Sequence, residues 1–348
     1  MKKNILALAV AAVAFNANAG TVKTDGEDLV ISTKGGLKVK TESNSASFQL
    51  GGRIQWDFDQ TEVDGGNATS DTDFRRARIF AKGHVGDWGY KAQFNIDGDG
   101  VEDLYIRYMG WGKGANVTIG KQKEPFGLEE QTSSKDISIL ERSALTETHA
   151  FGRNVGVQLH GKSGNFTYGI GVFEDGEGKD ESGDVALTSR FTYAPVKTDD
   201  TVVHFGLGLS ERSADVSAYN LEFAAVMGSF HFQAEQFETE LADMDVDGFY
   251  MQAGWILTGE QRPYKDGVFK RVKPSKDAGA WELVARYEDG YGKYSDVGLS
   301  TVEGNQLSLG INYYPNDNVR LGLSWMTAEE DESGLEGDEL RARVQFVY

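Results

Sequence analysis

Basic side chains recur at every second position in one short segment of the chain. Arg76, Arg78, Lys82 and His84 alternate there with small and apolar residues, and Phe80 interrupts the row. If the segment is extended, these cations share one face and follow one another at intervals of about 7 Å. Guanidinium groups bind oxyanions through paired hydrogen bonds and stay charged at every working pH. A row of such weak sites lets a small anion move along it without being trapped, so the pattern predicts an anion-conducting wall.

Further cations fall on the polar face of other alternating segments. They are Arg107, Arg190, Arg286, Arg320, Arg341 and Arg343. Of all these cations, we take as the candidate anion ladder Arg76, Arg78, Lys82, Arg107, Arg341 and Arg343. Carboxylates occupy the same faces, namely Asp57, Asp97, Asp103, Glu222, Glu235, Glu282 and Glu288. The charged faces therefore leave two possibilities open, an anion-preferring surface and an unselective or weakly cation-preferring one.

Two long connections between alternating segments are also rich in cations. The first, Lys121 to Asn154, mixes basic residues with Glu124, Glu129, Glu130, Asp136 and Glu141, so its cations could be anion sites or could be internally paired. Its candidate site residues are Lys121, Lys123, Ser133, Ser134, Lys135 and Arg142. The second, Thr258 to Gly279, carries a basic cluster made of Lys265, Lys270, Arg271, Lys273 and Lys276.

The elements that position these residues are predicted to be β-strands. Two-residue alternation of apolar and polar side chains repeats from about Ser47 to Tyr348, in about sixteen segments of roughly 9 to 12 residues. A helix would need apolar residues three and four apart. Aromatic residues such as Trp88 and Trp325 recur near segment ends, as in the interfacial girdles of membrane barrels. A barrel of this size cannot be filled by side chains, so its polar face must line water. The predicted fold is all-β, a transmembrane antiparallel barrel of about sixteen strands.

Three regions are expected along the chain. Residues 1–19 have a basic start, an apolar run and the small-residue pattern Ala17-Asn18-Ala19, which predicts a cleaved signal peptide. Residues 20–46 are expected to form a periplasmic N-terminal segment, and residues 47–348 the barrel domain. The net charge of −19 argues against nucleic acid as a partner. The chain has no cysteine, five histidines and no Gly-x-Ser-x-Gly motif, so we expect neither an enzyme nor a bound cofactor or metal.

Several stretches resemble a known family. Phe74-Arg75-Arg76-Ala77-Arg78, the run from Lys121 to Glu130, and Leu140-Glu141-Arg142-Ser143 are similar to the phosphate-selective porin O and P family. The resemblance implies a homotrimer of sixteen-stranded barrels in the Gram-negative outer membrane, in contact with its lipid. It implies a third external loop that folds inward as a constriction, an arginine ladder and a basic periplasmic region. The expected function is diffusion of small anions, phosphate or polyphosphate. The alternatives are a general or weakly cation-preferring porin and a non-conducting structural or adhesin barrel.

Overall fold

The computed structural model describes residues 20–24, 26–33, 35–98, 100–175, 185–213, 215–241 and 244–348. The predicted signal peptide, residues 1–19, lies outside the described residues, as does most of the acidic connection that follows Glu174.

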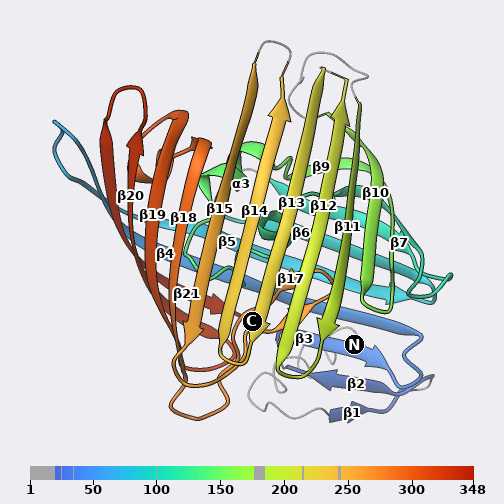
Figure 1. Cartoon of the computed structure of the whole chain (residues 1–348). Helices are drawn as coiled ribbons and strands as arrows, with labels where there is room; N and C mark the ends of the chain where they lie inside the picture. Colours follow the sequence, from blue (N-terminus) through green and yellow to red (C-terminus); the bar gives the residue numbers. More distant parts are fainter. Residues whose placement is uncertain are drawn as a thin grey trace.

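Sixteen antiparallel strands form a closed barrel (Figure 1). Each strand pairs with its neighbour along the chain, and the last strand pairs with the first through Phe346↔Ile54 and Arg343↔Asp57. The strands are β4 (Ala46–Val63), β5 (Thr69–Val85), β6 (Trp88–Asn95), β7 (Val101–Tyr108), β8 (Asn116–Lys123), β9 (Arg153–Ser163), β10 (Phe166–Glu174), β11 (Val185–Lys197), β12 (Thr201–Arg212), β13 (Val216–Met227), β14 (Phe230–Glu240), β15 (Asp245–Ile256), β18 (Ala280–Lys293), β19 (Thr301–Tyr314), β20 (Val319–Glu330) and β21 (Glu336–Val347). The predicted all-β barrel of sixteen strands is confirmed.

Short elements complete the chain. A meander of β1 (Gly20–Val22), β2 (Leu29–Ser32) and β3 (Leu37–Thr41) continues the sheet, because β3 pairs with β4 beyond the point where β21 ends. A small hairpin of β16 (Tyr264–Lys265) and β17 (Val268–Phe269) lies between β15 and β18. The helices are α2 (Leu128–Gln131), α3 (Ala144–His149) and the 3₁₀ turn η1 (Ser295–Val297). None of the helices in the described ranges is long and apolar enough to cross a membrane.

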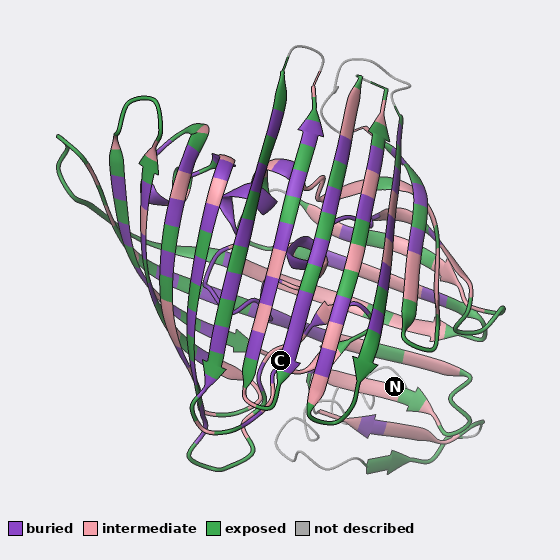
Figure 2. Cartoon of the chain, viewed as in Figure 1, coloured by how far each residue is buried: buried purple, intermediate pink, exposed green. Residues whose placement is uncertain are grey.

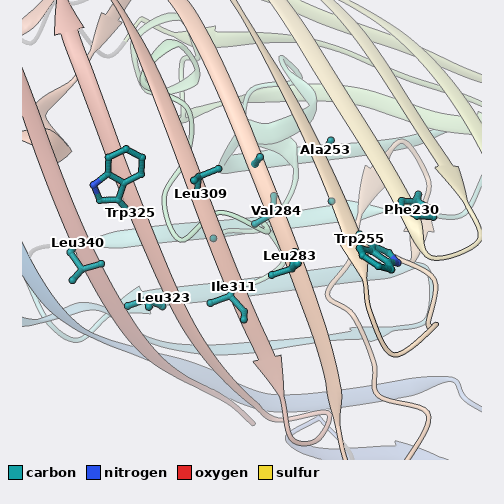
Figure 3. Close-up of a pocket in the computed structure, with 13 residues that line it drawn as sticks. Phe230, Ala253, Trp255, Leu283, Val284, Leu309, Ile311, Leu323, Trp325 and Leu340 are labelled. Carbon is teal, nitrogen blue, oxygen red and sulfur yellow. The ribbon is translucent and has the colours of Figure 1, made fainter.

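The barrel is apolar outside and polar inside. Large side chains such as Trp56, Leu221 and Trp255 are exposed on the outer face, whereas Arg286, Arg320 and similar residues are buried inside. Figure 2 shows this as bands of buried and exposed residues that alternate along each strand. This is the inside-out pattern of a barrel that contacts lipid. A shallow hollow of about 700 Å³ on the outer face of β14 to β21 is lined mostly by apolar residues, including Trp255, Leu283 and Trp325 (Figure 3), so it is not part of a polar pore.

Candidate pore site

The connection between β8 and β9 folds into the barrel. We call residues 124–152 the constriction loop; it includes α2 and α3, which lie within the ring of strands in Figure 1. Its apolar side chains are almost fully buried: Phe126, Ile137, Ile139, Leu140 and Leu145 are at most 2% exposed. The expected inward loop is therefore present.

Arginines of the barrel hold the loop by its backbone. Successive carbonyl oxygens from residue 136 to residue 142, with the exception of Ile139, accept hydrogen bonds from buried guanidinium groups. Arg262 donates to Asp136, Arg320 to Ile137 and Ser138, Arg343 to Leu140, and Arg286 to Glu141 and Arg142. We call these four residues the arginine clamp. Because buried carbonyls without partners are costly, the clamp fixes this segment against the wall formed by β14 to β21.

Close packing also holds the constriction loop against the wall of β14 to β21. A Cβ atom on Gly322 would lie 2.5 Å from a methyl carbon of Leu140, so a larger residue there would force the Leu140 side chain to shift. The N–H groups of Leu128 and Glu129, at the start of α2, donate to the Glu235 carboxylate at 2.6 and 2.8 Å. Gly127, just before that helix, adopts φ 71°, which favours glycine.

The hairpin of β16 and β17 also enters the barrel and reaches the loop. Phe269 packs in one cluster with Leu128 of α2, Val202 and Val226. The face of the Arg262 guanidinium lies 4.0 Å from the centre of the Phe269 ring. The loop is therefore supported by the far wall and by a segment that enters from the predicted periplasmic end.

The open space lies on the other side of the loop. A cavity of about 430 Å³ lies between the constriction loop and the wall of β4 to β9. Its charged lining contains nine cations and two carboxylates: Arg53, Arg75, Arg76, Arg78, Lys91, Arg107, Lys123, Arg142 and Arg153, with Asp103 and Glu147. Ser133, Ser134 and several glutamines complete the lining. We call this space the cationic cavity.

Like charges face each other on this wall. Arg53 on β4 lies directly opposite Arg78 on β5, and Lys82 on β5 lies opposite Lys91 on β6. The Nε atoms of Arg53 and Arg78 are buried and have no hydrogen-bond partner within the described part of the chain. Directly opposed like charges destabilise a sheet, and here Glu102 compensates Arg78 and Asp103 compensates Lys91.

The cationic cavity adjoins three others and shares lining residues with each of them. One of about 360 Å³ has Lys82, Lys135 and Arg271 in its lining, and no aspartate or glutamate among its lining residues in the described chain. The others, of about 400 and 580 Å³, both include Arg107. Lys38 and Lys40 of the N-terminal meander line the first of these two, and Lys162 lines the second.

Most predicted site residues lie along these cavities. The cationic cavity contains Arg76, Arg78, Arg107, Lys123, Ser133, Ser134 and Arg142, and the adjoining ones contain Lys82, Lys135 and Arg271. Of the basic cluster, Lys265, Lys273 and Lys276 are exposed and Lys270 is half-buried. No lining of the four described cavities includes Lys265, Lys270, Lys273 or Lys276.

Three predicted residues are placed differently. Lys121 pairs with Leu104 and Val155, two residues exposed on the outer face, so the register places Lys121 on that face. Arg343 pairs with Asp57 at 2.5 Å and belongs to the arginine clamp, and Arg341 pairs with Asp59 at 2.7 Å. Neither arginine is part of the cationic cavity's described lining. Their positions favour an anchoring role over anion binding.

Sequence reasoning did not select Arg53 and Lys91 as site residues. Both lie on the polar face of alternating segments, which is the signal that could have identified them. Their importance comes from the cross-strand register, which alternation within one strand does not give.

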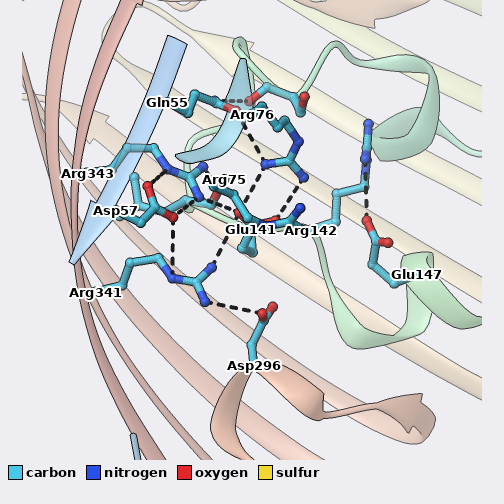
Figure 4. A network of polar contacts seen from close by, with 12 residues as sticks. Gln55, Asp57, Arg75, Arg76, Glu141, Arg142, Glu147, Asp296, Arg341 and Arg343 are labelled. Atoms are coloured by element: carbon cyan, nitrogen blue, oxygen red, sulfur yellow. Dashed lines mark hydrogen bonds and ion pairs between the residues drawn. The ribbon is translucent and has the colours of Figure 1, made fainter. Parts of the chain in front are cut away.

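The polar contacts of the loop gather around Glu141 (Figure 4). Its carboxylate lies within 4 Å of four guanidinium groups, those of Arg75, Arg76, Arg341 and Arg343. No group of three or more histidine, aspartate or glutamate side chains that could hold a metal ion occurs among the residues described.

The loop's ion pairs predict its behaviour in acid. Burial alone would raise the pKa of Glu130, but Arg142 and Lys123 hold it at about 2, below the usual 4.5. A lowered pKa in the folded state means that this stabilisation is complete above about pH 4.5 and is lost as the pH falls toward 2. Between pH 8 and 5 the loop stays ordered, so we expect the single-channel conductance to change little. Below about pH 4 the loop loosens, and we expect the conductance to become larger and noisier. Unchanged, quiet channels at pH 2.5 would contradict this role of Glu130.

Comparisons with known proteins agree with this architecture. The profile of the family described as "Phosphate-selective porin O and P" matches residues 48–217 and 209–348. Porin O of Pseudomonas aeruginosa is 30% identical over 99% of this chain and 97% of its own length. The anion-selective porin from Comamonas acidovorans superposes with a TM-score of 0.61 at 14% identity, over 87% of this chain and all of that one. The outer-membrane channel DcaP of Acinetobacter baumannii gives 0.57 at 12% identity, over 89% of this chain and 99% of that one. The chain therefore belongs to the phosphate-selective porin O and P family and is a porin of the Gram-negative outer membrane.

Proposed function

We propose that this porin passes small anions and favours phosphate-type oxyanions over chloride. The observation that carries the proposal is the charged lining of the cationic cavity, nine cations against two carboxylates. Arginine can bind a phosphate or polyphosphate oxygen pair through two parallel hydrogen bonds, which chloride cannot accept. Arg53 and Arg78 line the cavity at the position where the loop narrows the barrel.

The positions of the inward carboxylates favour an anion pore over a cation pore. Glu235 binds the start of α2, Glu282 accepts hydrogen bonds from Ser138 and Asn312, and Glu288 pairs with Arg286. These acids lie behind the constriction loop, where their hydrogen bonds and ion pairs go to groups that hold the loop against the wall. Asp103 does face the cationic cavity, but Lys91 and Arg153 pair with it at 2.7 and 3.2 Å. The charge that an entering ion meets is therefore positive.

The test is the reversal potential of the purified protein in a planar bilayer under a KCl gradient, followed by titration of phosphate against the chloride current. We expect an anion-selective reversal and block of the chloride current by phosphate. A cation-selective reversal would replace this proposal by the weakly cation-preferring alternative. Absence of single-channel steps would favour a structural barrel.

Two lysines on one strand provide a matched pair of variants. Lys123 lines the cationic cavity and pairs with Glu130 at 2.8 Å, whereas Lys121 lies on the outer face. Lys123→Ala removes a cation and leaves the Glu130 carboxylate beside the cavity with one positive partner fewer. We expect it to lower the chloride-to-potassium permeability ratio by about threefold or more, with Lys121→Ala close to wild type. Equal effects of the two variants would contradict the assigned register.

We also infer the assembly and the processing of the chain. A homotrimer is supported by the low wall of β6, β7 and β8, each eight residues long, with exposed apolar residues such as Trp88, Leu104 and Ile119. Native mass spectrometry in detergent tests it, and a monomer would exclude it. We further propose that residues 1–19 are removed on export and that residues 20–46 lie in the periplasm. The proposed function involves no catalysis and no cofactor.

A further inference from the structure

Glu141 is an unusual carboxylate for an anion pore, because it lies beside the cationic cavity yet is only 2% exposed. Its Oε1 atom accepts from Arg76 at 3.0 Å and from Arg343, and its Oε2 atom accepts from Arg75 at 3.1 Å and Arg76 at 3.0 Å. Arg341 lies 3.3 Å from Oε1. Burial by itself would raise the pKa of Glu141, but the surrounding arginines, Arg76 and Arg343 first, hold it well below its usual range. The carboxylate is therefore ionised at working pH.

The four arginines around Glu141 are not equivalent. Arg343 also pairs with Asp57, and Arg341 also pairs with Asp59, Glu339 and Asp296. Arg75 and Arg76 have no other carboxylate partner in the part of the chain that is described. If Glu141 lost its charge, Arg341 and Arg343 would keep other carboxylate partners. Arg75 and Arg76 would have none among the described residues.

The two dependent arginines are the ones that reach the pore. Arg75 and Arg76 both line the cationic cavity; the Arg75 side chain is 40% exposed and the Arg76 side chain 5%. Neither Arg341 nor Arg343 is in the described lining of that cavity.

We propose that Glu141 sets the affinity of the pore for anions by sharing Arg75 and Arg76 with the permeating ion. This inference rests on the proposed anion function and names a specificity-determining residue within it. A channel must bind its ion strongly enough to draw it in and weakly enough to release it. Arginines without a carboxylate would hold a phosphate-type anion too long. Glu141 competes for the same N–H groups and shortens that stay.

The experiment compares phosphate block and saturating conductance in Glu141→Gln and wild type, each reconstituted as the full protein in planar bilayers. The variant keeps the size of the side chain and removes its charge. We expect the phosphate concentration for half block to fall by about fivefold, as for loss of one charge a few ångströms from the ion in partly hydrated surroundings. We expect the maximal conductance at saturating phosphate to fall as well, because the anion leaves more slowly.

Glu129→Gln is the matched control. Glu129 lies in the same loop, is 1% exposed and accepts hydrogen bonds from the Ser143 N–H and the Thr146 hydroxyl, but its charged partner is Arg286, behind the loop. It should disturb loop packing without changing the half-block concentration. If Glu141→Gln does not assemble, Glu141→Asp withdraws the carboxylate from Arg75 and Arg76, and we expect a smaller shift in the same direction.

The outcomes separate this inference from the proposed function. A weaker block in Glu141→Gln, or equal shifts in Glu141→Gln and Glu129→Gln, would mean that Glu141 only holds the loop, and would overturn the inference. An unchanged block would overturn it too. A cation-selective wild type would instead remove the proposed function itself.

Discussion

Replacing Arg53 and Arg78 together by glutamine is expected to weaken phosphate block by about tenfold or more, while leaving the barrel about as stable as wild type. The two guanidinium groups face each other across β4 and β5. Arg53 has no carboxylate within 4 Å among the described residues, whereas Arg78 pairs with Glu102, which Arg153 also holds at 3.1 Å. Removing both arginines relieves a like-charge contact worth about 0.2–1 kcal/mol, which offsets the loss of the pair between Arg78 and Glu102. The same change removes two of the nine cations that line the cationic cavity.

Loss of anion binding without loss of stability makes the variant informative. Phosphate titration of the chloride current measures the loss of binding, and thermal unfolding in detergent measures stability. Lys293→Gln removes one charge from an exposed position outside the cavities described and should change neither quantity. A double variant that unfolds more easily but blocks normally would mean that this pair serves folding and not anion binding.

Replacing Arg320 by methionine is expected to release the constriction loop. Arg320 is fully buried and donates to the carbonyl oxygens of Ile137 at 2.6 Å and Ser138 at 2.5 Å, and to Asn312 at 2.9 Å. Methionine fills most of the space but removes the donor to the Ile137 carbonyl and to the Asn312 side-chain oxygen, whereas the Ser138 carbonyl still accepts from the Asn312 amide at 2.8 Å. We expect a cost of about 2–4 kcal/mol in unfolding free energy. We expect larger and noisier single-channel conductance together with weaker anion selectivity.

Arg320→Lys distinguishes the role of the paired hydrogen bonds to the loop from the role of the positive charge. Lysine keeps the positive charge but cannot reach both carbonyls with a rigid fork, so partial loosening is expected. If Arg320→Met instead lowered anion selectivity with unchanged conductance and stability, Arg320 would be a pore residue and not part of the arginine clamp.

Alternation predicted the strands and the side of the sheet on which each cation lies. The segments expected near Trp88, Ala280 and Asp338 each correspond to one strand, because a period of two follows directly from the pleat. The same signal could not separate Arg78, which lines the cationic cavity, from Arg320, which holds the loop. Both are inward arginines on strands. Only the path of the loop across the lumen distinguishes them, and that path depends on contacts between residues more than a hundred positions apart.

Strand ends and register account for the remaining differences. Lys121 and Lys123 have the same parity, yet Lys123 turns inward at the end of β8 to meet Glu130. No spacing rule predicts that turn. Arg53 became a candidate only when the pairing of β4 with β5 placed it opposite Arg78. The sequence resemblance identified the loop that narrows the barrel, but not which of its carboxylates meets the pore arginines.

The most direct test of the central claim is to locate a permeating anion in crystals of the protein. Anomalous scattering from bromide, as a substitute for chloride, and from tungstate, as a substitute for phosphate, marks each bound ion. We expect peaks within hydrogen-bond distance of Arg53 and Arg78, between the constriction loop and the wall of β4 to β9. Peaks confined to other parts of the barrel, with none in the cationic cavity at saturating anion, would contradict it.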